Sequence, residues 1–479
     1  MVADAELIAL DGAALARGYA KKNLSPVEVT RACLAQIDRL DARFGGYVLV
    51  DHERALQAAR ASEDRWNRGA SLGPLDGVPG SIKDIALVEG WPTWRGSRTR
   101  DDARAETVDA PSVRHLRAAG MVMLGKTSTP EFGWKAVTDN PRGDLARNPF
   151  DPTRTAGGSS GGAVVAAALG MGVMHLGSDG GGSIRIPSSF SGVAGLKPTF
   201  GRVPAWPPSP FGTVSHFGPI CRTVGDCALM LDVIARPDLR DWHVVPREAG
   251  SFARDLDAGV RGLRIAASPT LAFVDVDEEV RARFDAAVAT FTELGAKVHF
   301  VDPPIGRPRA LFETFWYGAA ANLVASVAPE RRDRLEPALR SVAAEGEGFD
   351  GRRIRAAMLE RDALGSAMQC WFDGFDLLLT PATAIPAFEA GHEVPPASSM
   401  TRWLDWAAFS WPFNLTQQPA MSVPCGRTAE GLPVGLQIVG AKFADATVLR
   451  AARAFERARP WSYDDVVVAA SDGREKPQA

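Results

Sequence analysis

The sequence predicts an α/β protein that folds as one large domain around a mostly buried sheet. Candidate strands alternate with candidate helices along the chain, which is the pattern of α/β folds. Hydrophobic residues make up 46% of the 479 residues and charged residues 23%, a balance typical of a soluble globular protein with a large core. We find no internal repeat and no long low-complexity linker, although this length would also allow about three ordinary domains.

Two helices are predicted near the start of the chain. Ser25-Pro26-Val27-Glu28 has the S-x-x-E pattern of a capping box, with proline at the first helical position, and an apolar periodic run continues to about residue 40. A second helix, rich in alanine and arginine, is predicted over about residues 53–69. Further along, the proline-rich stretch 203–210 is expected to be a surface loop.

The rest of the chain continues the alternation. Residues 263–267 are predicted to be a strand, 278–294 an amphipathic helix that ends at Gly295, and 297–302 a second strand, which together make one βαβ unit. Three more strands and one helix complete the prediction: strands at 376–380, 420–424 and 434–439, and a helix at about 445–457.

Charge and the chain ends exclude several classes of protein. Lys and Arg number 54 and Asp and Glu 57, so the formal net charge is −3, which excludes a strongly basic nucleic-acid binder and gives no overall attraction to anionic membranes. The N-terminal MVADAELIAL has no cleavable hydrophobic core, and the longest apolar stretch, 163–174, is shorter than the roughly 18–20 residues that span a bilayer. Five scattered cysteines fit free thiols in a reducing cytosol, so we expect a cytoplasmic protein.

Two short motifs match the sequence patterns of known sites but lack the secondary structure that those sites require. GMVMLGKT at 120–127 matches the phosphate-binding pattern G-x-x-x-x-G-K-[ST], but residues 121–124 look like a strand where a loop is needed, and Pro130 blocks a following helix. GGSSG at 157–161 matches the nucleophile elbow G-x-S-x-G, but it follows a loop at 148–155 and not a strand. The elbow stays a runner-up, with Asp376 and His392 as its candidate partners.

Two glycine- and serine-rich segments and one lysine form a better candidate site. Residues 157–187 read GGSSGGAVVAAALGMGVMHLGSDGGGSIRIP, in which a Gly/Ser loop and a helix at about 163–169 precede a glycine-rich turn with Ser183. Upstream, GVPGSIKD at 77–84 places Lys83 among small and apolar residues. Each feature alone is also explained by tight turns or a solvated surface charge.

Together these segments resemble the amidase signature family, in its stand-alone amidase branch. Ser159 and Ser183 lie 24 residues apart and Lys83 precedes Ser159 by 76 residues, as in that family. Further segments with family patterns are GKTSTPEFG at 125–133, SHFGPICRT at 215–223, PFNLTQQPAMSVPCG at 412–426 and GLPVGLQIVG at 431–440. The resemblance covers about residues 25–457. It implies one domain, 1–479, with a central mixed β-sheet flanked by helices and a C-terminal tail at 458–479.

The resemblance implies a Ser–Ser–Lys triad that hydrolyses amides through an acyl-enzyme. Ser183 would be the nucleophile, Ser159 the bridging serine, usually beside a cis peptide bond, and Lys83 the base. A serine hydroxyl needs an adjacent base, and a lysine acts as one only if its pKa falls from about 10.4 by about 3 units, which burial can cause. We therefore predict that Lys83 is buried and hydrogen-bonded to Ser159. Ser160, in the same loop, is a rival to Ser159 that the 24-residue spacing disfavours.

The turn that carries Ser183 is expected to bind the oxyanion. Glycines let a substrate approach bare backbone, so the expected donors are the N–H groups of Gly180, Gly181, Gly182 and Ser183. Asp179 and Arg185 flank the turn and are predicted to hold it, although an ordinary ion pair explains them equally. Gly133 corresponds to a family position that lines the acyl-side cavity. No metal or organic cofactor is expected.

The substrate class is less constrained. The tRNA-dependent amidotransferase subunit of this family typically has Asn after the Lys-Asp pair, whereas this chain has Ile85, which favours a stand-alone hydrolase. This chain also has Gln417 where the family commonly has Gly, so the substrate contacts near that position are not assigned. The chain has twelve tryptophans, and several of them could line an apolar pocket for aryl or hydrophobic amides. The candidates, which lie in or beside expected loops or variable helices, are Trp91, Trp94, Trp134, Trp206, Trp316, Trp403, Trp406 and Trp411.

Three alternatives remain beside an amidase of this type. Carbamate (urethane) or ester hydrolysis would use the same triad, an amidotransferase-type subunit would act in a complex, and a binding module would retain the triad as a relic. The expected partner is a small-molecule amide or carbamate, with no nucleic acid and no membrane, and a homodimer is left open.

Overall fold

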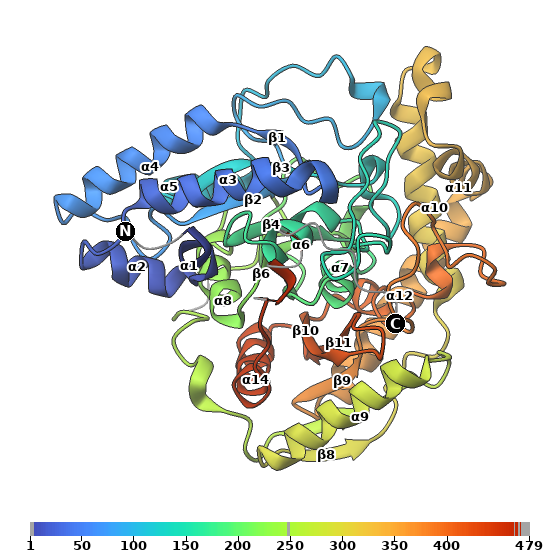
Figure 1. The fold of residues 1–479 in the computed structure, drawn as a ribbon. Helices are drawn as coiled ribbons and strands as arrows, with labels where there is room; N and C mark the ends of the chain where they lie inside the picture. Colours follow the sequence, from blue (N-terminus) through green and yellow to red (C-terminus); the bar gives the residue numbers. More distant parts are fainter. Residues whose placement is uncertain (1–3, 247–249, 464, 468–469, 471–479) are drawn as a thin grey trace.

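One mixed sheet runs through a computed structural model of the chain (Figure 1). The structure describes residues 4–246, 250–463, 465–467 and 470. Within them the strands are β1 Tyr47–Val50, β2 Pro79–Lys83, β3 Val122–Thr127, β4 Met174–Asp179, β5 Ala194–Lys197, β6 His216–Cys221, β7 Arg264–Ala267, β8 Lys297–Phe300, β9 Leu377–Pro381, β10 Ala420–Arg427 and β11 Pro433–Gly440. Their order is β1-β3-β2-β4-β6-β5-β10-β11-β9-β7-β8. The pairs β2–β3, β2–β4, β7–β8 and β7–β9 are parallel and the other neighbours antiparallel, which confirms the predicted mixed α/β sheet.

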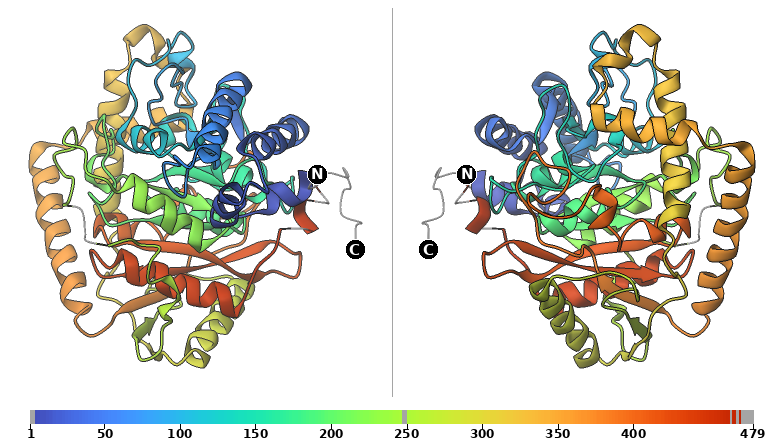
Figure 2. Two further views of the ribbon diagram at one scale, coloured as in Figure 1. Left: turned by 90° about the vertical axis from the view of Figure 1, so that its left-hand side faces the viewer. Right: turned by 90° about the vertical axis from the view of Figure 1, so that its right-hand side faces the viewer.

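Helices flank this sheet on all sides. They are α1 Asp4–Ala9, α2 Gly12–Ala20, α3 Pro26–Phe44, α4 His52–Asn67, α5 Pro111–Ala118, α6 Gly161–Ala168, α7 Arg185–Phe190, α8 Val224–Ile234, α9 Glu278–Glu293, α10 Arg309–Ser326, α11 Pro337–Glu347, α12 Gly351–Trp371, α13 Pro412–Leu415 and α14 Asp445–Ala458. In Figure 1, α2–α5 gather at one end of the molecule and α10–α12 at the other. Figure 2 shows α9 beneath the red strands β10 and β11, which it contacts.

The predicted elements are present, with small shifts at their ends. Ser25 caps α3 by accepting from the Val27 N–H at 3.0 Å, and the helix extends to Phe44, a few residues beyond the predicted end, before Gly45 adopts a φ of +66°. The predicted βαβ unit is confirmed as β7, α9 and β8, and β7 and β8 pair in parallel.

Neither motif that matched in letters only forms the site its pattern describes. Lys126 lies in β3, fully buried, with its Nζ 2.8 Å from Asp84 Oδ1, so it belongs to a buried ion pair and not to a phosphate-binding loop. Asp376 pairs with Arg264 at 2.9 Å, and His392 is half exposed and closest to Glu389 at 3.8 Å. Among the described contacts neither residue reaches the serines of 157–161, so the nucleophile-elbow triad is not assembled.

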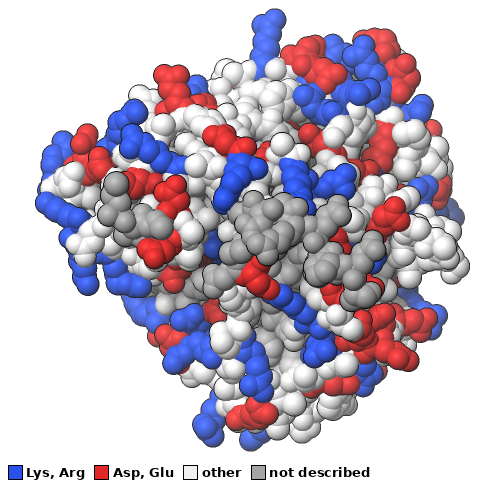
Figure 3. All heavy atoms as spheres, viewed as in Figure 1, with Lys and Arg blue, Asp and Glu red and all other residues white. Residues whose placement is uncertain are grey.

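Segments outside the predicted 25–457 core also pack against the sheet. Leu7 and Ile8 of α1 are buried, and Tyr463 donates to Gly192 O at 2.8 Å. Residues 471–479 of the predicted tail lie outside the described residues. No described helix has the length and apolarity needed to cross a membrane. Figure 3 shows acidic and basic side chains interspersed over the face drawn, which fits the near-neutral charge balance.

Candidate active site

Two parallel strands and one helix bring the predicted triad segments together. β2 and β4 are neighbours in parallel, with Gly80 opposite Met174 and Ile82 opposite Leu176. The carboxyl ends of parallel strands meet at the same edge of a sheet, so Lys83 at the end of β2 lies beside the end of β4. α6, which lies between β3 and β4 in the chain, carries Ser159 and Ser160 in the loop before its first residue.

Lys83 is fully buried at this edge, as predicted. Its Nζ lies 2.7 Å from Ser159 Oγ, 2.9 Å from Ser160 Oγ and 3.0 Å from Ser178 Oγ. Burial holds the pKa of Lys83 well below its ordinary value, and the negative charge of Asp179 opposes this shift only in part. The amine is therefore placed to act as a neutral base surrounded by hydroxyl groups.

Ser159 and Ser160 both reach Lys83 but differ in their other contacts. Ser159 follows a cis peptide bond at Gly158–Ser159 and lines a cavity. The Ser160 hydroxyl donates to Ser178 O at 3.1 Å, so its proton is already engaged in the backbone of β4. The Ser160 N–H also donates to Ser183 O at 3.1 Å and ties the two serine loops together.

Ser183 faces the same cavity as Ser159 and Ser178. It is 6% exposed, at the turn between β4 and α7. The apolar walls of this cavity are formed by Ile85, Phe132, Trp206, Phe211, Phe217 and Trp316. Two of the tryptophans singled out in the sequence thus reach it, whereas Trp134, Trp403, Trp406 and Trp411 are packed in a hydrophobic core. Trp316 stacks on Phe211 at 3.9 Å between ring centroids and donates to Trp134 O.

Asp179 and Arg185 hold the Ser183 turn as a buried pair. Arg185 Nε and one Nη each lie 2.9 Å from the Asp179 carboxylate, and both side chains are fully buried. Burial alone would raise the pKa of Asp179, but the Arg185 charge and hydrogen bonds lower it below its ordinary range. Arg185 is fixed in turn by Asn414 Oδ1 at 2.6 Å and Gln437 Oε1 at 2.7 Å.

One predicted oxyanion donor is used elsewhere. The Gly182 N–H donates to Asp179 Oδ1 at 2.8 Å, so it supports the turn and does not point to a substrate. Gly182 has a φ of +126°, and a Cβ there would come within 2.5 Å of Ser410 Cβ, so the turn requires glycine for its shape. Within the described residues, the N–H groups of Gly181 and Ser183 have no hydrogen-bond partner, and Gly180 lines the cavity.

Gly133 lies against Ser159, the predicted bridging serine. It has a φ of +74°, and a Cβ at this position would lie 3.3 Å from Ser159 Oγ and 2.9 Å from Ile85 Cδ1. We expect Gly133→Ala to lower kcat/KM by about 10-fold or more, because the added methyl group displaces Ser159 and narrows the cavity. The measurement is steady-state kinetics beside thermal unfolding.

Gly143→Ala is the matched control for that change. Gly143 also has a positive φ, +98°, but nothing lies within 4 Å of its added Cβ, so the variant carries the backbone strain without the contact. Equal kcat/KM losses in the two variants would show that strain, and not the contact with Ser159, is responsible.

Three residues of the site were not assigned from the sequence. Ser178 holds Lys83, while Asn414 and Gln437 hold Arg185. Ser178 directly precedes Asp179 in the glycine-rich segment, and this adjacency was the only available signal for it. The other two lie more than 200 positions from Arg185, and a single sequence does not indicate such a pairing.

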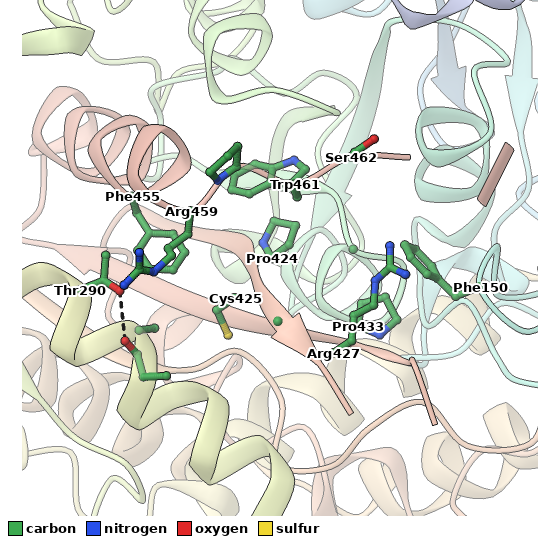
Figure 4. Close-up of a pocket in the computed structure, with 15 residues that line it drawn as sticks. Phe150, Thr290, Pro424, Cys425, Arg427, Pro433, Phe455, Arg459, Trp461 and Ser462 are labelled. Carbon is green, nitrogen blue, oxygen red and sulfur yellow. Dashed lines mark hydrogen bonds between the residues drawn. The ribbon is translucent and has the colours of Figure 1, made fainter. Parts of the chain in front are cut away.

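A second, roomier hollow of about 380 Å³ lies elsewhere (Figure 4). Its lining is mostly apolar, with Phe150, Pro424, Phe455 and Trp461, and its Arg459 pairs with Glu293 at 3.0 Å. The lining includes a cysteine, Cys425, whose pKa is raised by burial to about 12, so its thiol is not activated.

Comparison with known proteins decides the family. Residues 28–449 match the family model described as Amidase. The chain belongs to the amidase signature family. This amidase is 38% identical to an acylamidase of Rhodococcus erythropolis over 471 residues, which cover 96% of this chain and 98% of that protein. It is 36% identical to a glutamyl-tRNA(Gln) amidotransferase subunit of Myxococcus xanthus (strain DK1622), over 92% and 96% of the two chains.

A solved structure gives the same result. The fold of this amidase matches a crystal structure described as a bacterial aryl acylamidase of the amidase signature family, with a TM-score of 0.89 and 32% identity over 98% of this chain and 99% of that one. The protein is thus an amide-hydrolysing enzyme.

Proposed function

We propose that the protein is a stand-alone amidase in which Ser183 is the nucleophile, Ser159 the bridging serine and Lys83 the base. The observation that carries this assignment is the fully buried Lys83 amine, 2.7 Å from Ser159 Oγ in the loop that borders Ser183. A desolvated lysine with hydroxyl neighbours and no carboxylate in contact favours its neutral form, which is the form a base needs.

The hydrogen-bond directions support a proton relay through Ser159. Since the Ser160 proton is engaged by Ser178 O, Lys83 must donate to Ser160 Oγ. A neutral amine has two N–H groups and one lone pair. If the second N–H donates to Ser178, the lone pair faces Ser159 Oγ, which can give its own proton to Lys83. The relay further requires Ser159 to accept a proton from Ser183, which lines the same cavity.

The proposed reaction proceeds in two stages. Ser183 Oγ attacks the amide carbon while its proton passes through Ser159 to Lys83, and the oxyanion accepts hydrogen bonds from the N–H groups of Gly181 and Ser183. The same relay returns the proton to the nitrogen of the leaving amine as the C–N bond breaks. Water then attacks the acyl-enzyme, releases the acid and restores the Ser183 hydroxyl.

The cavity walls favour an aryl or hydrophobic amide. Phe132, Phe211 and Trp316 offer aromatic faces beside Ser183, and a similar protein is described as an aryl acylamidase. The free volume of the cavity is about 50 Å³, which holds only a few water molecules. We therefore expect a bulky anilide to need adjustment of the cavity walls, which include the proline-rich segment 206–211.

Carbamates and esters are the second candidate substrates, because the same acyl transfer would cleave them. A panel of anilides, primary amides, esters and carbamates, compared by kcat/KM, orders these classes. Turnover by the purified chain, eluting alone in size-exclusion chromatography, favours the stand-alone enzyme. An inactive chain that requires a co-purifying protein favours the amidotransferase-type subunit.

Alanine substitution distinguishes the roles of the two neighbouring serines, Ser159 and Ser160. We expect Ser159→Ala to lower kcat by about 10³-fold or more, because the proton relay is broken. Ser160→Ala removes one acceptor of Lys83 and should cost about 10-fold. Turnover and thermal unfolding of both variants are the measurements, and a loss confined to Ser160→Ala would reverse the assignment.

A further inference from the structure

A single charged side chain lines the active-site cavity. Of the described residues that form its walls, only Arg95 carries a formal charge. The Arg95 guanidinium makes no hydrogen bond or ion pair with the described residues, and its Nε is completely enclosed without a partner. Arg95 is partly buried, and its terminal nitrogens are not enclosed as its Nε is. A partly desolvated cation without a counter-charge is costly, so such a group is expected to have a ligand.

The backbone of Arg95 is fixed by hydrogen bonds to two segments of the active site. Arg95 has a φ of +55°, which is unusual for a residue other than glycine, and such conformations concentrate at functional sites. Its N–H donates to Asp84 Oδ2 at 2.8 Å, and its carbonyl accepts from the Phe132 N–H at 2.7 Å. Asp84 directly follows Lys83, and Phe132 directly precedes Gly133, so Arg95 is attached to both sides of the site.

The carboxylates nearest to Arg95 already have cationic partners. Asp84 forms the buried pair with Lys126, and Glu106 lies 3.9 Å from Arg100. Burial, together with the charge of Arg100, lowers the pKa of Arg95, and the negative charges of Glu106 and Asp84 oppose this shift only in part.

We propose that Arg95 binds a carboxylate of the substrate, so that this amidase cleaves amides with an anionic group on the acyl or the amine side. A guanidinium can donate two parallel hydrogen bonds to a carboxylate, which fixes both the position and the orientation of the ligand. The aromatic walls accommodate the apolar part of such a substrate. This inference rests on the proposed function, since it names the substrate class of the same site.

Matched substrate pairs test the contact. N-succinyl-4-nitroanilide is compared with N-butyryl-4-nitroanilide for the acyl side, and 4-acetamidobenzoate with acetanilide for the amine side. In at least one pair the anionic member should have the higher kcat/KM, by about 10- to 100-fold. Arg95→Gln should abolish this preference by lowering kcat/KM for the anionic member more than for the neutral member, while Arg95→Lys should keep part of it.

Arg98→Gln is the control, because this neighbouring arginine is exposed and does not line the cavity. Binding of 4-acetamidobenzoate and N-succinyl-4-nitroanilide to the Ser183→Ala protein, measured by calorimetry, tests the contact without turnover and should weaken when Arg95→Gln is added. Equal rates for both members of each pair, or equal losses of both in Arg95→Gln, would overturn this inference alone. Absence of turnover with every amide would instead count against the proposed function. The calorimetric binding measurements would still show whether Arg95 binds the carboxylate.

Discussion

Replacing Ser183 by alanine is expected to lower kcat by about 10⁴-fold or more and to leave the free energy of unfolding within about 1 kcal/mol. In the proposed mechanism the variant lacks the atom that becomes acylated, and only the proposed oxyanion donors and substrate binding remain to accelerate hydrolysis. The Ser183 side chain makes no hydrogen bond within the described residues, so its loss removes little from the folded state. Turnover of the best anilide and chemical denaturation are the two measurements.

Ser188→Ala is the matched control for this substitution. Ser188 lies in α7, five positions after Ser183, and its hydroxyl is buried without a hydrogen-bond partner. Removing it should leave kcat unchanged and should not destabilise the fold. Mass spectrometry of the enzyme quenched during turnover should show the acyl adduct in the control and not in Ser183→Ala. Parental turnover by Ser183→Ala would refute Ser183 as the nucleophile.

Replacing Lys83 by methionine is expected to lower kcat/KM by about 10³-fold or more, because no other described base contacts the serines. In the parent enzyme, kcat/KM should rise with pH through the pKa of Lys83 and then level off, since only the neutral amine accepts a proton. Burial lowers that pKa well below 10.5, so the plateau is reached far below the pH at which an exposed lysine loses its proton. The measurement is kcat/KM across the pH range in which the protein stays folded.

Lys297→Met serves as the control for this change, because Lys297 is an exposed lysine at the start of β8. It should retain the parental rate and pH profile. A parental enzyme whose activity rises only near pH 10 would contradict the proposed role of Lys83, because its amine would then behave as if it were in water.

The segments with the candidate catalytic residues could be predicted from the sequence because each is a short local motif. Lys83, Ser159 and Ser183 stand in small-residue segments at family spacing, and burial of the lysine followed from the demand for a neutral amine. The strands that position them, β2 with sequence PGSIK and β4 with sequence MHLGSD, were not predicted. Both are buried throughout, yet neither has the run of apolar residues typical of a buried parallel strand, because each contains glycine and polar residues. The helices α10–α12 were also missed, although α10 supplies Trp316 to the cavity.

Features that depend on distant partners could not be read from one sequence. The Gly182 N–H was assigned to the oxyanion, but the Asp179 carboxylate, held by Arg185, accepts it first. No sequence pattern marks Arg95 as a candidate site residue, because its lack of a partner is visible only in the folded cavity. The contact of Gly182 with Asp179 is short in sequence, but Asn414 and Gln437 fix the Arg185 side chain that holds Asp179 from more than 200 positions away. Local patterns, in contrast, determine caps, turns and motif spacing.

The anchoring of Arg185 has a consequence for the order in which activity arises during synthesis. Lys83, Ser159 and Ser183 all leave the ribosome within the first 200 residues, but Arg185 is fixed by Asn414 and Gln437, close to the end of the chain. A nascent polypeptide with its reactive hydroxyl exposed would lack the support that shapes the turn. We therefore expect hydrolytic competence to arise only when the last strands of the sheet are in place, and a chain truncated before them to be inactive.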